Sequence, residues 1–156
     1  HSRFFWGFRL YLLCTPDGMP VIWGLANPKI GEREAAGAML EHDRHLLHPG
    51  QVIIGDKGFA GREFETFITE DLGAHLIRPD RKDENPKFGK LGGVRQWVES
   101  VFDTLKGQLT LEDHGGRTPT GVYSRVAARL LALAAGIWHN WLTGAPAKRS
   151  LIAYNH

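Results

Sequence analysis

Glu99 stands between two cations in a segment, residues 93–108, whose pattern predicts an amphipathic helix. At about 100° per residue, Arg95, Glu99 and Lys106 fall within a band roughly 40° wide. We expect the neighbouring apolar stripe to pack inward: Val94, Val98, Val101 and Leu105. One interpretation is a solvated helix edge, on which Arg95 and Glu99 form a weak surface ion pair. The other is that Glu99 borders the core and helps to hold a divalent cation, while Arg95 and Lys106 hold phosphates on either side of it.

Asp56 is the candidate for a second carboxylate. It follows a short β-branched run, residues 52–54, which is too short for a helix and continuous enough to predict a buried strand. The carboxyl ends of parallel strands are where α/β sheets place their sites, because the loops splay apart there. The alternative is a purely local turn, since Asp and Gly favour such geometry by themselves.

The elements around Asp56 indicate an α/β sheet. Two apolar runs, residues 3–14 and 21–26, flank a Pro-Asp-Gly turn and predict an antiparallel hairpin. A helix over about residues 31–47 follows. The strand at 52–54, a helix over 61–73 and a short strand over 74–79 then alternate in short steps, which favours a parallel pairing.

The second half of the chain predicts a loop and two helices. Residues 79–93 are polar and punctuated by Gly and Pro, which is typical of an exposed, mobile loop. Its cations could close over a phosphate backbone or simply be solvated: Arg81, Lys82, Lys87 and Lys90. A helix over about 94–109 follows. Thr118 is the expected N-cap of a last long helix, with Pro119 at its first position and an apolar face made by Val122, Val126, Leu130, Leu133 and Ile137.

Composition places limits on the kind of protein. At 156 residues, with 42% hydrophobic and 23% charged residues, the chain has the size and composition of one ordinary globular domain. The net charge of +2 divides into −2 for residues 1–78 and +4 for residues 79–156, which permits contact with a polyanion without requiring it. The longest apolar run, residues 130–138, is far shorter than the roughly 20 residues that cross a bilayer. The single cysteine, Cys14, can form no internal disulfide, and we expect a cytoplasmic protein.

Most of the five tryptophans lie in apolar runs, so we expect them in the core rather than stacked on bases. Trp97 is the exception, because the helical rotation places it at the margin of the buried stripe. The full set is Trp6, Trp23, Trp97, Trp138 and Trp141.

Several motifs in order resemble one protein family. "FFWGFRLYLL" with "DGMP", then "IIGDKGFAG", then Arg95-x3-Glu99-x6-Lys106 are together similar to the later two thirds of the catalytic domain of bacterial insertion-sequence transposases of the aspartate-aspartate-glutamate type. The similarity is to the group with a Tyr-x2-Arg-x3-Glu-x6-Lys signature, and it covers nearly the whole chain. It implies a ribonuclease H-like mixed sheet flanked by helices, with Asp56 and Glu99 as the second and third acidic ligands of Mg²⁺ or Mn²⁺.

The resemblance also implies partners. Double-stranded DNA, as transposon ends and as target, would be the substrate of metal-dependent strand cleavage and strand transfer, and a homodimer would form in the transpososome. The residues expected to contact DNA are Arg95, Lys106, Lys57, Arg81 and Lys82.

Two departures from the family pattern affect these expectations. The position of the signature Tyr is Gly92, and the family's first Asp belongs to a central strand that precedes the hairpin with which this chain begins. Asp17, in a predicted turn, cannot replace it. We therefore expect a partial catalytic domain over residues 1–144, a tail over 145–156, and a chain that is inactive alone because a bridging Asp normally holds the two metals. The alternatives are a non-catalytic remnant that at most binds DNA and a host nuclease or recombinase of the same fold.

Overall fold

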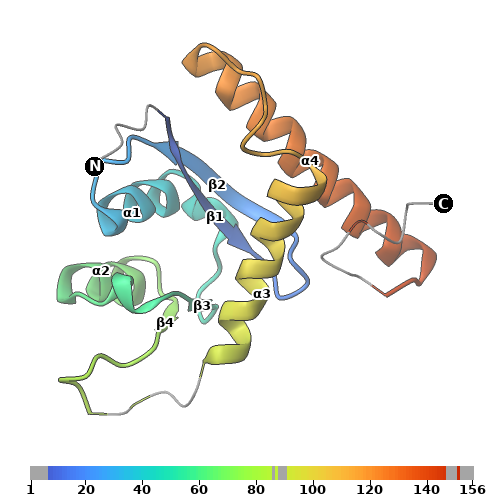
Figure 1. The fold of residues 1–156 in the computed structure, drawn as a ribbon. Coiled ribbons are helices and arrows are strands. Elements are labelled where there is room, and N and C mark those ends of the chain that lie inside the picture. The colour runs from blue at the N-terminus through green and yellow to red at the C-terminus, as the bar shows by residue number, and fades with distance from the viewer. Residues whose placement is uncertain (1–6, 86, 88–90, 147–150, 152–156) are drawn as a thin grey trace. The chain divides into compact units, whose positions relative to one another are not determined.

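The chain forms two compact units, one of residues 1–12 and 22–93 and the other of residues 13–21 and 94–156. The computed structural model describes residues 7–85, 87, 91–146 and 151, without the side chains of Val94 and Arg95 (Figure 1). Strands and helices are interspersed, so the predicted α/β class is confirmed.

The predicted hairpin is confirmed. Strands β1 (Arg9–Cys14) and β2 (Pro20–Ala26) form a two-stranded sheet. In the connection between them, the Thr15 N–H donates to the Met19 carbonyl at 2.9 Å and the Gly18 N–H to the Thr15 carbonyl at 2.8 Å. A connection this short requires antiparallel strands, because a parallel pair needs a long crossover. The first residues of the predicted run, 3–6, lie outside the described residues.

Helix α1 (Glu32–His42) ends before the predicted boundary near residue 47. After Asp43 the chain tightens into a 3₁₀ turn (Arg44–Leu46), in which the Leu46 N–H donates to the Asp43 carbonyl at 2.9 Å. The side chain of Arg44 also donates to the Asp71 carbonyl at 2.9 Å, so this turn is held by a contact outside α1.

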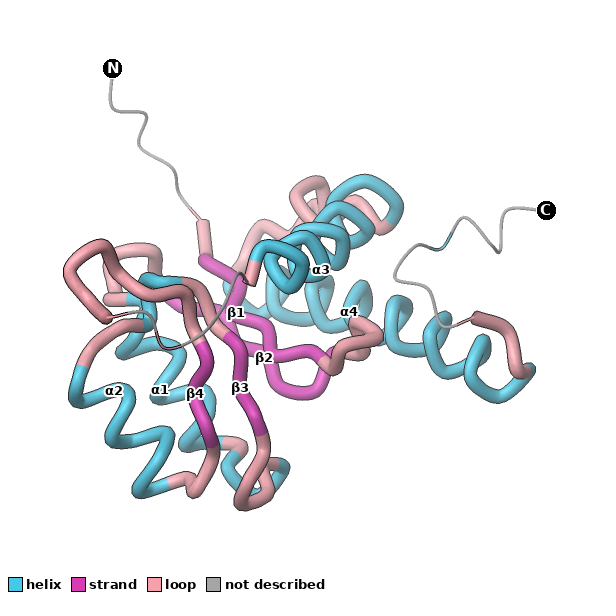
Figure 2. Tube along the Cα trace, turned by 90° about the horizontal axis from the view of Figure 1, so that it is seen from below, coloured by secondary structure: helices cyan, strands magenta, loops and turns pink. Residues whose placement is uncertain are grey.

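The predicted strand, helix and parallel strand are present. Strands β3 (Val52–Ile54) and β4 (His75–Ile77) pair in parallel, side by side in Figure 2. Between them, helix α2 (Arg62–Thr66) continues as a π-helical segment (Phe67–Asp71). The buried side chains of this region are Ile53, Ala60, Phe64, Ile68, Leu72 and Ala74.

The expectation that β3 is fully buried is wrong for two of its three side chains. Ile53 is buried, whereas Val52 is 54% exposed and Ile54 is 40% exposed. Alternate residues of a strand point to opposite faces. Only the face that carries Ile53 is therefore covered.

The second unit is built on two helices. Helix α3 (Gly92–Asp103) continues as a π-helical segment (Thr104–Gln108), and helix α4 (Pro119–Thr143) begins at the predicted cap. The Gly121 N–H donates to Thr118 Oγ1 at 3.1 Å, and Pro119 is the first helical residue, as predicted. The side chains buried in this unit include Val101, Leu105, Val122, Val126, Leu130, Leu133 and Ile137.

Other predictions of burial are wrong. Val98, expected to face inward, is 49% exposed. Trp97, which was expected at the margin of the buried stripe, is 45% exposed. Of the tryptophans expected in the core, Trp138 is 53% exposed and Trp141 is 65% exposed, while Trp6 lies outside the described residues. The helical period identifies which side chains share a face, but a helix with several apolar faces need not have all of them covered.

Among the described helices, none is both long enough and apolar enough to span a membrane.

Candidate active site

Asp56 lies two residues beyond the end of β3 with an extended backbone. Its Oδ1 accepts a hydrogen bond of 2.6 Å from the Gly58 N–H and so caps the 3₁₀ turn Lys57–Phe59. The local-turn interpretation therefore describes part of what this side chain does. Asp56 is also exposed, so the capped carboxylate can be reached from solvent by a cation.

The parallel register brings the residues after β3 and β4 to the same edge of the sheet. The Gly55 N–H donates to the Ile77 carbonyl at 2.9 Å, which extends the ladder one residue beyond the strands. Arg78 directly follows Ile77, and the turn that contains Asp56 directly follows Gly55. This edge is the place where sites form in α/β sheets.

Arg78 is buried at this edge, where two carboxylates surround its charged guanidinium. It is 7% exposed, and it donates from Nη1 and Nη2 to both carboxylate oxygens of Glu84 at 2.7 and 2.8 Å, and from Nε to Glu65 Oε1 at 2.8 Å. The hydrogen bonds with Glu84 raise the pKa of Arg78, and those from Arg78 lower the pKa of Glu84 to about 2. Burial alone would raise the pKa of Glu65, but hydrogen bonds from Arg78 and the Gly61 N–H outweigh it and lower that pKa. With two carboxylates around it, Arg78 is not a phosphate-binding cation.

A second contact fastens the loop after β4 to the turn after Asp56. The Ala60 carbonyl accepts hydrogen bonds of 2.9 Å from Arg81 Nη2 and from Arg33 Nη1. The Arg81 N–H in turn donates to Glu84 Oε2 at 2.9 Å. The loop predicted to be mobile is therefore anchored over residues 78–84. The candidate DNA contacts of the first unit, Lys57, Arg81 and Lys82, are all exposed in these two segments.

Glu99 is exposed on α3. The narrow band predicted to hold Arg95, Glu99 and Lys106 on one side of the helix does not extend to Lys106 as expected. The Leu109 N–H donates to the Thr104 carbonyl at 3.1 Å, a π-type bond that spans five residues. The rotation per residue is smaller there, so the assumed 100° fails beyond Asp103. Lys106 Nζ lies 2.7 Å from Glu112 Oε1, and both side chains are exposed. The side chain of Arg95 lies outside the described residues.

Asp56 belongs to the first unit and Glu99 to the second. Their meeting around one metal ion stays a prediction. Within the part of the chain that the structure describes, no group of three or more His, Cys, Asp or Glu side chains is arranged to hold a metal ion.

The comparison with known families decides the identity. A family model described as "Transposase DDE domain" matches residues 1–135. The chain belongs to the transposase DDE domain family. No curated protein and no solved structure matched it. As a transposase domain, it has a role related to transposition, in agreement with the motif resemblance.

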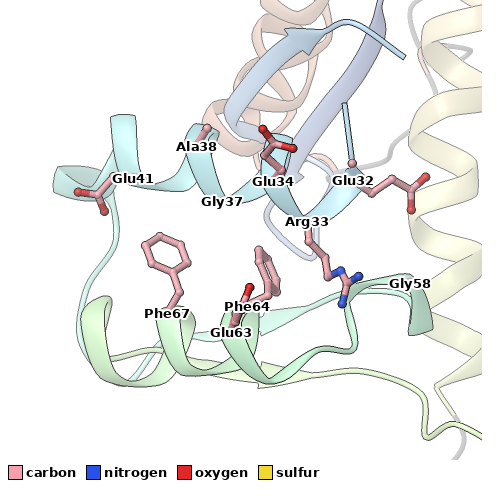
Figure 3. Close-up of a pocket in the computed structure, with 11 residues that line it drawn as sticks. Glu32, Arg33, Glu34, Gly37, Ala38, Glu41, Gly58, Glu63, Phe64 and Phe67 are labelled. Carbon is pink, nitrogen blue, oxygen red and sulfur yellow. The ribbon is translucent and has the colours of Figure 1, made fainter. Parts of the chain in front are cut away.

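A groove of about 800 Å³ lies between α1 and α2 of this transposase domain (Figure 3). Phe64 and Phe67 rise from α2 and its continuation toward α1, and Gly58 forms part of the lining. The acidic residues of the lining are Glu32, Glu34, Glu41 and Glu63. Among the lining residues that the structure describes, the one cation is Arg33, which donates a hydrogen bond to the Ala60 carbonyl. An anionic lining repels phosphate, so this groove is not a candidate for DNA binding.

Sequence reasoning missed Arg78 and its two carboxylates. The local signal was a charged residue immediately after a short strand, in "LIRPD". Its partners lie thirteen residues before it and six residues after it, and no helix or strand period connects such positions. The arrangement in the transposase domain depends on how α2 and the loop fold back on β4.

Proposed function

We propose that this transposase domain acts in metal-dependent cleavage and strand transfer at the ends of an insertion sequence, with Asp56 and Glu99 as ligands of Mg²⁺ or Mn²⁺. The support for this is the family match together with the position of Asp56 at the carboxyl end of a parallel strand. We also propose that the mixed α/β arrangement is part of a ribonuclease H-like sheet. The parallel β3–β4 pair with an intervening helix supports this.

The donor chemistry at Asp56 fits a hard divalent cation. Mg²⁺ prefers a few carboxylate oxygens together with substrate phosphates. The Gly58 N–H fixes one oxygen of Asp56, which orients the carboxylate before any ion arrives. When bound, a pair of such ions would supply an activated nucleophile and stabilisation of the leaving oxygen. The domain's part is to present carboxylates at fixed places and to hold the DNA backbone.

Cations near Asp56 would hold that backbone. Lys57 is the next residue, and Arg81 is tied through Ala60 to the same turn, with Lys82 beside it. In the second unit we assign Arg95 and Lys106 to phosphates that flank the metal held by Glu99. The Lys106–Glu112 pair is exposed, so its loss on DNA binding costs little.

Among these residues we assign none to the family's first Asp. We therefore propose that the chain alone binds a divalent ion weakly and does not cut DNA. Mn²⁺ titration of the chain tests the two ligands: Asp56→Asn and Glu99→Gln should each weaken binding several-fold. Asp103→Asn, one turn along α3 from Glu99, is the matched control and should leave binding unchanged. Equal affinity in all four proteins would refute the assignment.

Cleavage is tested with the chain extended through its upstream coding sequence. Nicking of DNA that carries the element's ends should then require Mg²⁺ or Mn²⁺ and be abolished by Asp56→Asn or by Glu99→Gln. Activity that survives both substitutions would rule out these residues as ligands.

DNA binding is tested separately by filter binding at increasing salt. Phosphate contacts make the affinity fall steeply with salt. Lys57→Ala and Lys82→Ala should each lower the affinity and flatten the salt dependence, whereas Lys29→Ala, in the loop before α1, should do neither. A chain that binds without cutting in any extended form would match the non-catalytic alternative.

A further inference from the structure

Glu32 and Asp56 lie close together although they are far apart in the sequence. Glu32 is the first residue of α1, and Asp56 caps the 3₁₀ turn Lys57–Phe59. A Cβ placed on Gly58 would be 3.1 Å from Glu32 Oε2 and 2.8 Å from Asp56 Oδ1. The two oxygens are therefore at most about 6 Å apart, whereas neighbouring oxygens on one octahedral Mg²⁺ ion are about 3 Å apart. A small rotation of the exposed Glu32 side chain is enough to bring both oxygens to one ion.

Each of these carboxylates has one oxygen held by the protein and a second oxygen left over. Glu32 Oε1 accepts a hydrogen bond of 3.0 Å from Arg9 Nη1, and Asp56 Oδ1 accepts one of 2.6 Å from the Gly58 N–H. Among the described residues, none donates a hydrogen bond to Glu32 Oε2 or to Asp56 Oδ2. Both side chains are thus oriented, and each keeps an oxygen for another ligand.

The charge of the pair favours a cation. Two carboxylates this close repel each other, and a cation between them removes the repulsion. Arg9 offsets part of this charge, but 41% of its side chain and 49% of that of Glu32 are exposed, and exposed ion pairs contribute little. Mg²⁺ and Mn²⁺ take oxygen ligands, and Mg²⁺ is usually bound through one or two carboxylates, with waters or substrate phosphates in the other positions. Glu32 and Asp56 provide such a donor set.

We propose that Glu32 is a further ligand of the divalent cation assigned to Asp56. The inference rests on the proposed function, whose support at Asp56 is the family match and the end of a parallel strand. It adds a residue that the family resemblance does not supply, since the acidic ligands implied there are Asp56 and Glu99. Glu32 and Asp56 belong to the same unit, so this pair binds the ion without a contribution from Glu99.

The helix dipole offers a simpler explanation for the charge of Glu32. Carboxylates are stabilised at a helix N-terminus, and Glu34 lies in the same first turn of α1. The dipole acts on both residues and does not account for the direction of Glu32. Figure 3 shows the two carboxylates leaving α1 in different directions, and of the two only Glu32 is among the nearest neighbours of Gly58. Glu34 is therefore the control that separates metal ligation from the helix dipole.

Mn²⁺ titration of the full 156-residue chain, followed by the paramagnetic resonance signal of free Mn²⁺, tests the ligand. Glu32→Gln should weaken binding several-fold. Glu34→Gln removes the same charge from the same turn and should leave binding unchanged. Asp56→Asn tests the proposed function in the same experiment. If Asp56→Asn weakens binding and Glu32→Gln does not, Glu32 is not a ligand and the proposed site stands; if neither weakens it, the proposed site fails and this inference with it.

A shorter side chain separates coordination from charge alone. Glu32→Asp keeps the negative charge but withdraws it by one methylene group, so ligation predicts an affinity as low as that of Glu32→Gln. Wild-type affinity in Glu32→Asp would mean that the carboxylate acts only through its charge, and would overturn the proposal. Urea denaturation of each variant checks that it folds. We expect little loss of stability, because the Arg9–Glu32 pair is exposed.

The double variant tests whether the two carboxylates share one ion. Ligands of the same ion are coupled, so their losses do not combine independently. Asp56→Asn combined with Glu32→Gln should therefore bind Mn²⁺ little more weakly than the weaker of the two single variants. Losses that multiply would indicate two independent sites and would overturn the shared ion.

Discussion

Arg78 donates two parallel hydrogen bonds to Glu84, from Nη1 to Oε2 at 2.7 Å and from Nη2 to Oε1 at 2.8 Å. The fork of the guanidinium matches both oxygens of the carboxylate, which gives the strongest form of such a pair. Because Arg78 follows β4 directly and also binds Glu65 of α2, the pair fixes the loop against the sheet edge that carries Asp56. The ion cluster therefore holds the loop after β4 at the sheet edge that carries Asp56.

This pair predicts how stability depends on pH. In the folded chain the pKa of Glu84 is lowered from 4.5 to about 2, and that of Glu65 is lowered as well. A depressed pKa contributes stability that is fully present above the unfolded value, and that is lost as the pH falls toward the folded value. We expect the free energy of unfolding, measured by urea denaturation, to fall between about pH 4.5 and pH 2. Glu84→Gln should reduce this slope, and an identical slope in that variant would contradict the assignment.

Replacement of Arg78 separates charge from geometry. Arg78→Met leaves Glu65 and Glu84 without their cation and should lower the free energy of unfolding by on the order of 2 kcal/mol at pH 7. Arg78→Lys keeps the charge but cannot form the two-pronged contact, so it should lie between wild type and Arg78→Met. Urea denaturation of the three proteins provides the measurement. If Lys restores full stability, the fork geometry contributes nothing.

Local patterns in the sequence were sufficient to predict the elements next to Asp56 and the start of α4. The run at 52–54, the following helix and the strand expected over 74–79 predicted the parallel pair, and Thr118 with Pro119 predicted the start of α4. These signals depend on side chains within a few residues of one another, where backbone preference decides the outcome.

The features that the sequence did not predict depend on contacts between distant residues. The spacing of apolar residues along a helix or strand carries no information on such contacts. The π-helical segment at 104–108 changes the rotation per residue after α3. Lys106 therefore pairs with Glu112 instead of lying in one band with Glu99. Trp138 lies in an apolar run yet is half exposed, because the pattern reports that a residue is apolar and not whether another element covers it. The joint position of Asp56 and Glu99 is likewise a matter of how two units meet, and it stays a prediction.

Gly58 has no side chain, and this leaves room for the Asp56 carboxylate. A Cβ at Gly58 would lie 2.8 Å from Asp56 Oδ1 and 3.1 Å from Glu32 Oε2. We expect Gly58→Ala to displace the carboxylate and to weaken Mn²⁺ binding several-fold. The change in stability should be small, since the atoms met are the ends of side chains. Titration with Mn²⁺ and urea denaturation measure the two effects.

The matched control for Gly58→Ala is Gly31→Ala. Gly31 precedes α1 with φ −59°, and the nearest atoms to an added Cβ there belong to Glu34 at 4.0 Å. Its Mn²⁺ affinity should equal that of the wild type. Equal loss in both variants would mean that Asp56 is not the group disturbed.

Thr118 determines where α4 begins, and its removal should destabilise the second unit. Its Oγ1 accepts from the Gly121 N–H at 3.1 Å, satisfying one of the otherwise unpaired donors of the first turn. Thr118→Ala should cost about 1 kcal/mol of unfolding free energy, whereas Thr118→Ser keeps the hydroxyl and should cost much less. Urea denaturation compares them. Because the buried Val122 lies in the first turns of α4, the loss should also appear as faster amide exchange there. Equal stability of the Ala and Ser variants would show that the hydroxyl does not stabilise this helix end.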